Sequence, residues 1–153
     1  MGERFPLGYL VPLRILCGLI LVLEGWGKLQ HGWLHGTPLL GTLDGWVAAN
    51  KTYGFFLPVV QSARSHPKIF GVLVTTGELA IGLSMLVGLL TRLAAILGAL
   101  LLFSFAFGGG QGLVPPGNAL LMGALFVLFI FAPPGRVLGL DHALRARFPR
   151  WMV

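Results

Sequence analysis

The stretch LGYLVPLRILCGLILVLEGWGKLQ, residues 7–30, decides the fold. It is an apolar run interrupted by Arg14, Glu24 and Lys28. An α-helix rises about 1.5 Å per residue, so this run is long enough to cross a hydrocarbon layer about 30 Å thick. A charge in hydrocarbon costs several kcal/mol, and such residues therefore pair with one another or line a functional cavity. The run predicts a membrane-spanning helix that carries an unusual set of charges.

Three further apolar runs follow, at about residues 68–90, 93–107 and 116–132. Glycines at 108–110 follow the third run and Pro-Pro-Gly at 115–117 begins the fourth, which is the expected punctuation of helix ends and starts. The sequence therefore predicts an all-α membrane protein, a four-transmembrane-helix bundle that occupies residues 1–153 as a single domain.

Composition supports this class. The chain has 153 residues, of which 56% are hydrophobic and 10% are charged, whereas a soluble domain carries about 25% charged residues. The mean hydropathy is +0.84. The formal net charge of +6 arises from basic residues at the ends of apolar segments, as in membrane proteins oriented by positive charge. We therefore expect the lipid bilayer as a partner, and no nucleic acid.

Lysine and arginine indicate how the helices are oriented. With four spans, one side of the membrane holds Arg4, Arg14, Arg92, Arg136, Arg145, Arg147 and Arg150, and the other holds Lys28, Lys51, Arg64 and Lys68. The side richer in basic residues faces the cytoplasm, so both termini are predicted to be cytoplasmic. Within the basic C-terminal tail, residues 136–153, the segment from Asp141 to Arg150 is predicted to lie along the anionic inner leaflet.

The long outer loop between the first two predicted helices, residues 31–67, is not an ordinary hydrophilic linker. It contains apolar stretches at 38–40, 46–48 and 55–60. We expect a re-entrant or surface-lying segment that caps the bundle, because backbone at membrane depth must be satisfied by protein or water. The aromatic belt predicted for this interface consists of Trp26, Trp33, Trp46 and Tyr53.

Charges on the first two predicted spans fall at matched heights. Arg14 and Lys28 are fourteen residues apart, as are Glu78 and Arg92, which corresponds to about 21 Å of helix rise. If the two helices are antiparallel neighbours, Glu78 comes level with Lys28, and Arg92 comes level with Arg14. We expect Arg14 and Arg92 to extend to the inner headgroups, as structural charges that orient the bundle.

Lys28 is the centre of the candidate site. Glu24 lies four residues before it, the favourable order for an i,i+4 ion pair. Asn118 reaches the same level from the start of the fourth helix. Two interpretations stay open. The group of Glu24, Lys28, Glu78 and Asn118 is either a polar lock that holds three helices in register, or a pocket that binds a quinone carbonyl and exchanges its protons.

Small residues predict the faces along which the helices meet. Gly18 and Gly25 share a stripe with the charges of the first helix and allow a neighbouring backbone to approach closely. On the second helix, Ala80, Ser84 and Gly88 form a ridge at four-residue spacing, on a different side from the acidic residue of that helix. We expect this ridge to pack against another helix.

The positions of the histidines and the number of cysteines limit which cofactors the protein is expected to bind. Because no histidine lies deep in a predicted span, a bis-histidine haem is not expected. His31 and His35 are four residues apart but have no acidic or thiol neighbour, so no metal site is expected. The single cysteine, Cys17, excludes a CxxC dithiol centre. No catalytic residue is assigned, and whether the protein is an enzyme stays open.

Several motifs resemble those of the DoxX family in their order and spacing. They are GWGKL at 25–29 after Arg14, GELAIG at 77–82, GLLTRL at 88–93, Asn118-Ala119, and GR…GLD at 135–141. The resemblance implies a four-helix protein of the bacterial or archaeal cytoplasmic (inner) membrane. The family includes the small subunit of thiosulfate:quinone oxidoreductase. Relatives linked to thiol redox carry cysteine pairs, whereas this chain has Cys17 alone.

The resemblance favours an integral membrane subunit of a quinone-linked redox complex, with its polar site near the outer interface. Quinone is then the expected ligand, and other membrane-protein subunits are the expected partners. The alternative is a small accessory subunit of a larger respiratory or photosynthetic complex, with no catalytic role of its own. A transporter for a small molecule or ion is a third hypothesis.

Overall fold

Helices dominate the chain. The computed structural model describes residues 7–110, 118–144 and 149. The long helices are α1 (Leu10–Gln30), α4 (Pro67–Val87) and α5 (Thr91–Gly109). The shorter ones are α2 (Thr37–Ala48), α3 (Leu57–Ser65), α6 (Ala119–Phe131) and α7 (Leu140–Leu144). Single 3₁₀ turns are η1 (Leu7–Tyr9), η2 (Trp33–His35), η3 (Gly54–Phe56) and η4 (Pro134–Arg136).

Within the described residues, α1, α4 and α5 are long and apolar enough to cross a membrane. They coincide with the predicted runs at 7–30, 68–90 and 93–107, which are thus confirmed as helices. α6 is apolar, but its 13 residues rise only about 20 Å. The predicted start of the fourth helix, at 116, lies outside the described residues, so the four-span count stays a prediction. The chain is a multi-pass membrane protein.

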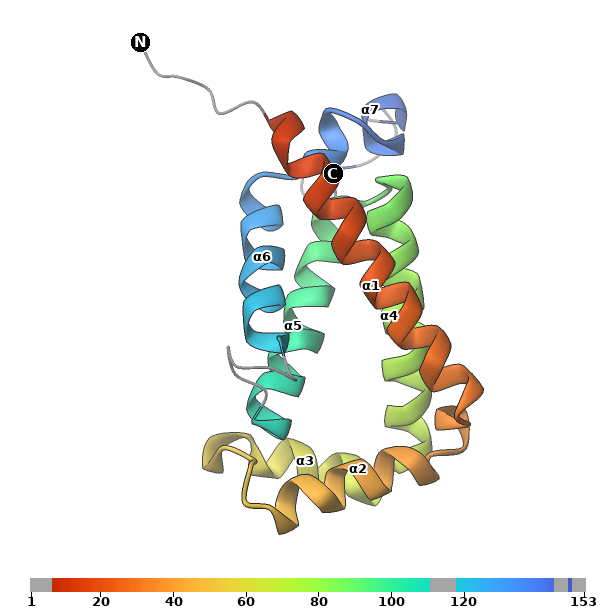
Figure 1. The fold of residues 1–153 in the computed structure, drawn as a ribbon, viewed down its shortest axis with the longest axis vertical. Helices are drawn as coiled ribbons and strands as arrows, with labels where there is room; N and C mark the ends of the chain where they lie inside the picture. Colours follow the sequence, from red (N-terminus) through yellow and green to blue (C-terminus); the bar gives the residue numbers. More distant parts are fainter. Residues whose placement is uncertain (1–6, 111–117, 145–148, 150–153) are drawn as a thin grey trace.

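α1 and α4 form one antiparallel pair (Figure 1). Gly18 and Gly82 meet where they cross, and a Cβ on Gly18 would lie 2.9 Å from the Gly82 carbonyl oxygen. Gly25, two turns along α1, likewise faces Glu78 and Leu79 of α4. Glycine permits this backbone approach because it has no side chain. The prediction that Gly18 and Gly25 admit a close neighbour is confirmed.

The three members of the ridge predicted on α4 have different surroundings. Ala80 is exposed and Ser84 is half-buried, whereas Gly82 lies directly against α1. Gly88, the third member, is buried against the Arg14 guanidinium of α1, and the packing of the whole ridge against another helix stays a prediction. The face that carries Glu78 is the one turned toward α1.

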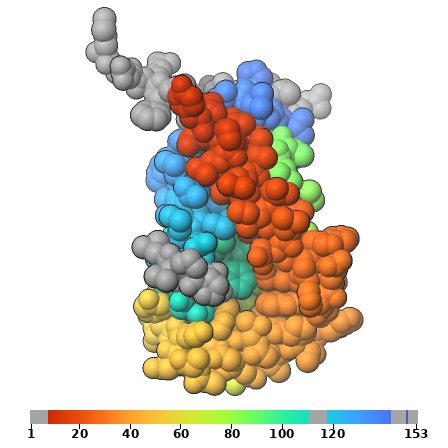
Figure 2. All heavy atoms as spheres, viewed as in Figure 1, coloured from red at the N-terminus to blue at the C-terminus, as the bar shows by residue number. Residues whose placement is uncertain are grey.

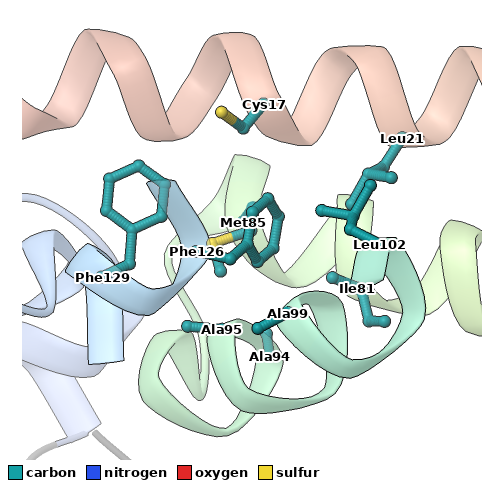
Figure 3. Packing of buried hydrophobic residues seen from close by; sticks show 10 residues of the cluster. All are labelled: Cys17, Leu21, Ile81, Met85, Ala94, Ala95, Ala99, Leu102, Phe126 and Phe129. Carbon is teal, nitrogen blue, oxygen red and sulfur yellow. The ribbon is translucent and has the colours of Figure 1, made fainter. Parts of the chain in front are cut away.

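α5 and α6 form the second pair, and a shared core joins it to the first. Gly98 of α5 lies against the ring of Phe126, and Gly123 of α6 lies against the ring of Phe103. Figure 3 shows that α1, α4, α5 and α6 all contribute to this core. Its buried members are Cys17, Leu21, Ile81, Met85, Ala94, Ala95, Ala99, Leu102, Phe126 and Phe129.

The predicted outer loop folds into α2 and α3, which lie across one end of the bundle (Figure 1). A second cluster holds them there, formed by Leu39, Leu43, Val60 and Ala63. At Gly36, with φ of 85°, the chain turns into α2. An exposed ion pair joins the two helices, with Arg64 Nε donating to Asp44 Oδ1 at 2.7 Å. The segment therefore covers this end of the bundle as two helices, and its place on the outer side of the membrane stays a prediction.

The opposite end of the bundle, which we call the α7 end, corrects the prediction for Arg14. Its side chain is 2% exposed, and Nη1 donates a hydrogen bond to the Leu138 carbonyl oxygen at 2.6 Å. Gly88 and Gly139 lie against the guanidinium and leave room for it. Because the C-terminal segment folds back over α1, Arg14 does not extend outward to headgroups. Arg92 is half-buried in the first turn of α5.

The position of Asp141 contradicts the prediction that the surface-lying tail segment begins at residue 141. It is fully buried and accepts hydrogen bonds from the backbone N–H groups of Leu90, at 2.6 Å, and Thr91, at 2.9 Å. The Thr91 hydroxyl donates to the same carboxylate at 2.5 Å. Asp141 therefore satisfies the free N–H groups at the start of α5, and does not belong to a surface tail. Residues 145–148 and 150–153 lie outside the described residues.

Candidate functional site

An ion pair between α1 and α4 forms the centre of the site. Lys28 Nζ lies 2.8 Å from the Glu78 carboxylate and donates a hydrogen bond to its Oε1. The Glu78 side chain is 4% exposed and that of Lys28 is 13% exposed. Gly25, one turn before Lys28, faces the Cβ of Glu78 and brings the two helices close enough for this contact. The matched heights in the sequence therefore correspond to a direct contact.

Glu24 is the second carboxylate near Lys28. Its Oε2 lies 3.5 Å from Lys28 Nζ, and its side chain is 65% exposed. The pair follows the i,i+4 spacing of α1. With both carboxylates ionised and Lys28 protonated, the group carries one net negative charge. The exposed position of Glu24 connects the buried Lys28–Glu78 pair to the surface.

A cavity of about 510 Å³ lies between the two helix pairs, beside this ion pair. The pairs are close together near the α7 end and diverge toward α2 and α3 (Figure 1). Figure 2 shows the same face in space-filling form. The cavity is lined by Ile20, Leu21, Glu24, Lys28, Trp33, Thr42, Trp46, Glu78, Leu102, Phe105, Asn118, Ala119, Leu121, Met122 and Leu125.

Aromatic rings surround the lysine. Lys28 Nζ lies 5.4 Å from the ring centroid of Trp33 and 5.4 Å from that of Phe105. A cation at this distance is attracted to the faces of such rings. Trp46 and Thr42 enter the cavity wall from α2. Sequence reasoning placed Trp33 and Trp46 in an aromatic belt and assigned no role to Thr42, although Thr42 and Trp46 are four residues apart and share a helix face.

Asn118 lies in the cavity wall at the start of α6, as its predicted height implies. Its side chain is exposed, and within the described residues it makes no hydrogen bond to Lys28 or Glu78. The structure therefore brings all four predicted residues to one cavity, but joins three of them by direct contacts. Arg14 and Arg92 are at the other end of the bundle.

Two histidines, His31 and His66, have partners within their own helical turns. The His31 ring nitrogen Nδ1 lies 2.6 Å from the Gly27 carbonyl oxygen, and His66 Nδ1 lies 3.3 Å from that of Ser62. Among the described residues, no group of three or more His, Cys, Asp or Glu residues is placed to hold a metal ion. Among the described lining residues, the polar groups are one ammonium, two carboxylates, one hydroxyl, one amide and the indole N–H groups of Trp33 and Trp46.

Comparison with known proteins identifies the family. The DoxX family model matches residues 9–109, which include α1 to α5 and the contacts among Glu24, Lys28 and Glu78. Asn118 and the 135–141 motif lie beyond the matched residues. No curated protein and no solved structure matches the chain. Since the match covers more than half of the sequence, the chain belongs to the DoxX family.

Proposed function

We propose that this DoxX protein is an integral membrane subunit of a quinone-linked redox complex, and that its cavity holds the quinone ring. The observation that carries the proposal is the Lys28–Glu78 ion pair beside a mainly apolar cavity of about 510 Å³. Ligand sites commonly enclose about 300–1,000 Å³ and use a few polar groups to fix orientation. Such a lining suits a quinone, whose ring has apolar faces and two carbonyl oxygens.

Lys28 has a donor available for a quinone carbonyl. Its ammonium carries three N–H donors, and the two carboxylates at 2.8 and 3.5 Å engage two of them. Reduction of a quinone to a quinol takes up two electrons and two protons. In our proposal Lys28 passes one proton to the ring oxygen beside it, and the carboxylates of Glu78 and Glu24 restore the proton of Lys28 from the surface. The second ring oxygen takes its proton from water. The electrons come from a redox partner subunit of the complex.

The opening of the cavity between α1 and α6 supports access from the bilayer. Within the described residues, α1 and α6 have no extensive contact with each other. Ile20 of α1 and Leu121 of α6 line the cavity, and Leu121 is 49% exposed. A lipid-soluble ligand can therefore move from the membrane into the cavity between these two helices.

The distribution of basic residues supports an orientation for this activity. In our proposal the protein has four spans in the bacterial or archaeal cytoplasmic membrane, with both termini in the cytoplasm. The α2–α3 end, and with it the cavity, then faces outward. Protons are exchanged with the outer side through Glu24, which lies at that end of α1.

Quinone-linked turnover of the complex, purified with its partners from the native membrane, tests the proposal. Glu78→Gln keeps an oxygen that accepts a hydrogen bond from Lys28 but cannot take up a proton. We expect it to reduce turnover by about 100-fold, the scale of a lost acid–base group, while quinone still co-purifies. Asp44→Asn is the matched control, because it removes an exposed ion pair with Arg64 outside the cavity.

The outcomes separate the proposal from its alternative. Full turnover by Glu78→Gln, or a wild-type complex that carries and binds no quinone, would contradict the proposal. If Glu78→Gln fails to assemble and Asp44→Asn assembles normally, the ion pair acts as a polar lock. In that case the protein is better described as an accessory subunit of a larger membrane complex.

A further inference from the structure

A second, smaller cavity lies among α2, α3, α4 and α5 and has an almost wholly apolar lining. Its volume is about 160 Å³. The lining residues are Leu39, Leu43, Trp46, Phe56, Val59, Val60, Ala63, Phe70, Leu73, Val74, Leu101, Ser104 and Phe105. Ser104 adds little polarity, because its hydroxyl donates to the Leu100 carbonyl oxygen of its own helix at 2.8 Å. We call this space the apolar groove.

The apolar groove adjoins the polar cavity at one aromatic pair. Trp46 and Phe105 line both spaces, and their rings meet edge to face with centroids 6.0 Å apart. Trp46 is held in place from its other side, because Gly108 and Gly109 of α5 lie against its indole ring. The Lys28 ammonium is 5.4 Å from the Phe105 centroid. The groove therefore begins one ring away from the charged centre.

Size and chemistry indicate that the groove takes part of a ligand. Ligand sites commonly enclose about 300–1,000 Å³, so about 160 Å³ is too small for an independent one. Its lining suits a hydrocarbon chain. The other way out of the polar cavity, between α1 and α6, has the carboxylate of Glu24 and the amide of Asn118 in its wall. A chain leaving there would lie against these polar groups.

Building on the function proposed above, we propose that the apolar groove receives the first part of a quinone's hydrocarbon chain while the ring lies beside Lys28. The ligand class is then a membrane quinone with a prenyl or alkyl chain on its ring. The chain lies along the Trp46–Phe105 pair and leaves the protein between α4 and α5, on the side of the exposed residues Val59 and Leu73.

In this proposal the groove mainly fixes the position of the quinone ring and adds little to the affinity for the quinone. Lipid tails are as apolar as the groove, so moving a chain from bilayer to protein brings little hydrophobic gain. Filling the groove should therefore exclude quinones that carry a chain and spare quinones that lack one. This selective effect is specific to the groove and would not result from a general loss of binding.

The experiment measures quinone binding by the full-length protein in lipid nanodiscs. The probes are one benzoquinone ring without a chain and the same ring with a two-isoprene chain, each corrected for partition into lipid. Binding is followed by quenching of tryptophan fluorescence, since Trp33 and Trp46 line the polar cavity. Ser104→Phe fills the groove from α5. Val59→Phe fills it from α3 at an exposed position, in case the first variant does not fold.

Thr76→Phe is the matched control. Like Ser104, Thr76 is a helical residue whose hydroxyl donates to the carbonyl oxygen four residues earlier. It is exposed on α4 and lines neither cavity. We expect a groove-filling variant to weaken binding of the chain-bearing quinone by about tenfold, the scale of one steric clash. Its binding of the chainless ring, and both affinities of Thr76→Phe, should stay within twofold of wild type.

Two results would overturn the groove assignment and leave the proposed function intact. In one, both groove variants bind the two quinones as wild type does. In the other, Leu121→Trp, at the opening between α1 and α6, excludes the chain-bearing quinone selectively. A wild-type protein that binds neither quinone would instead refute the proposed function, and the groove assignment with it.

Discussion

At the scale of the residue, the ion pair between Lys28 and Glu78 joins α1 to α4 in the half of the bundle nearer α2 and α3. Both side chains are largely removed from the surface, and Nζ is 2.8 Å from the carboxylate. Taking charges out of water is costly, and only a close partner offsets that cost. Removing one member therefore leaves an uncompensated charge, whereas replacing both members leaves none.

Lys28→Met tests this dependence. It leaves Glu78 buried without its cation, and we expect it to lower the free energy of unfolding by about 3–5 kcal/mol, as for other broken buried pairs. The double variant Lys28→Met/Glu78→Gln should recover most of that loss while remaining without quinone-linked turnover. Thermal unfolding in detergent measures both proteins. A double variant no more stable than Lys28→Met would show that the charges are not coupled.

The sequence predicts this contact because helix geometry converts residue spacing into height. The fourteen-residue separations place Glu78 level with Lys28, and the four-residue step places Glu24 beside it. Trp46 was not assigned to the site, because it reaches the cavity from α2. The position of that helix depends on the left-handed turn at Gly36 and on tertiary contacts, which helical periodicity does not encode.

At the scale of the element, the crossing of α1 and α4 depends on glycines that face backbone. A Cβ on Gly18 would lie 2.9 Å from the Gly82 carbonyl oxygen and 2.9 Å from the Leu86 nitrogen. Backbone atoms cannot turn aside as a side chain can, so the helices themselves would have to separate. The sequence indicated this face of α1, whereas it did not identify Gly82 as the residue of α4 that meets it, because several small residues compete there.

Gly18→Ala and Gly27→Ala form a matched pair on the same helix. We expect Gly18→Ala to destabilise the protein by about 1–3 kcal/mol, as overpacking does. A Cβ on Gly27 would meet no atom within 4 Å among the described residues, so Gly27→Ala should be neutral or stabilising by up to about 1 kcal/mol. Thermal unfolding of the two proteins side by side gives the comparison. Equal stabilities would contradict the close crossing.

At the scale of the whole molecule, two helix pairs are joined by a core near the α7 end and held apart by α2 and α3 (Figure 1). The cavity exists because the pairs diverge toward α2 and α3. The sequence predicted the long helices and a capping segment. It did not predict that Asp141 would cap α5, because that contact joins residues fifty positions apart through the fold of the C-terminal segment.

Asp141→Ala tests how strongly that segment stabilises the fold. It leaves the N–H groups of Leu90 and Thr91 and the Thr91 hydroxyl without their acceptor. We expect a loss of about 1–3 kcal/mol, the cost of buried donors left unpaired. Asp44→Ala, which removes an exposed ion pair, should change the unfolding temperature little. A similar unfolding temperature for Asp141→Ala and wild type would contradict the capping role.

The burial of Arg14 has a consequence for biogenesis. Its acceptor, the Leu138 carbonyl oxygen, is synthesised 124 residues later. A nascent chain that has already inserted α1, α4 and α5 therefore carries an arginine whose final partner is still inside the ribosome. The α7 end can close only after residues 138–141 have emerged, so these contacts form after the long helices have been synthesised. A chain interrupted before residue 138 lacks this acceptor for the Arg14 guanidinium.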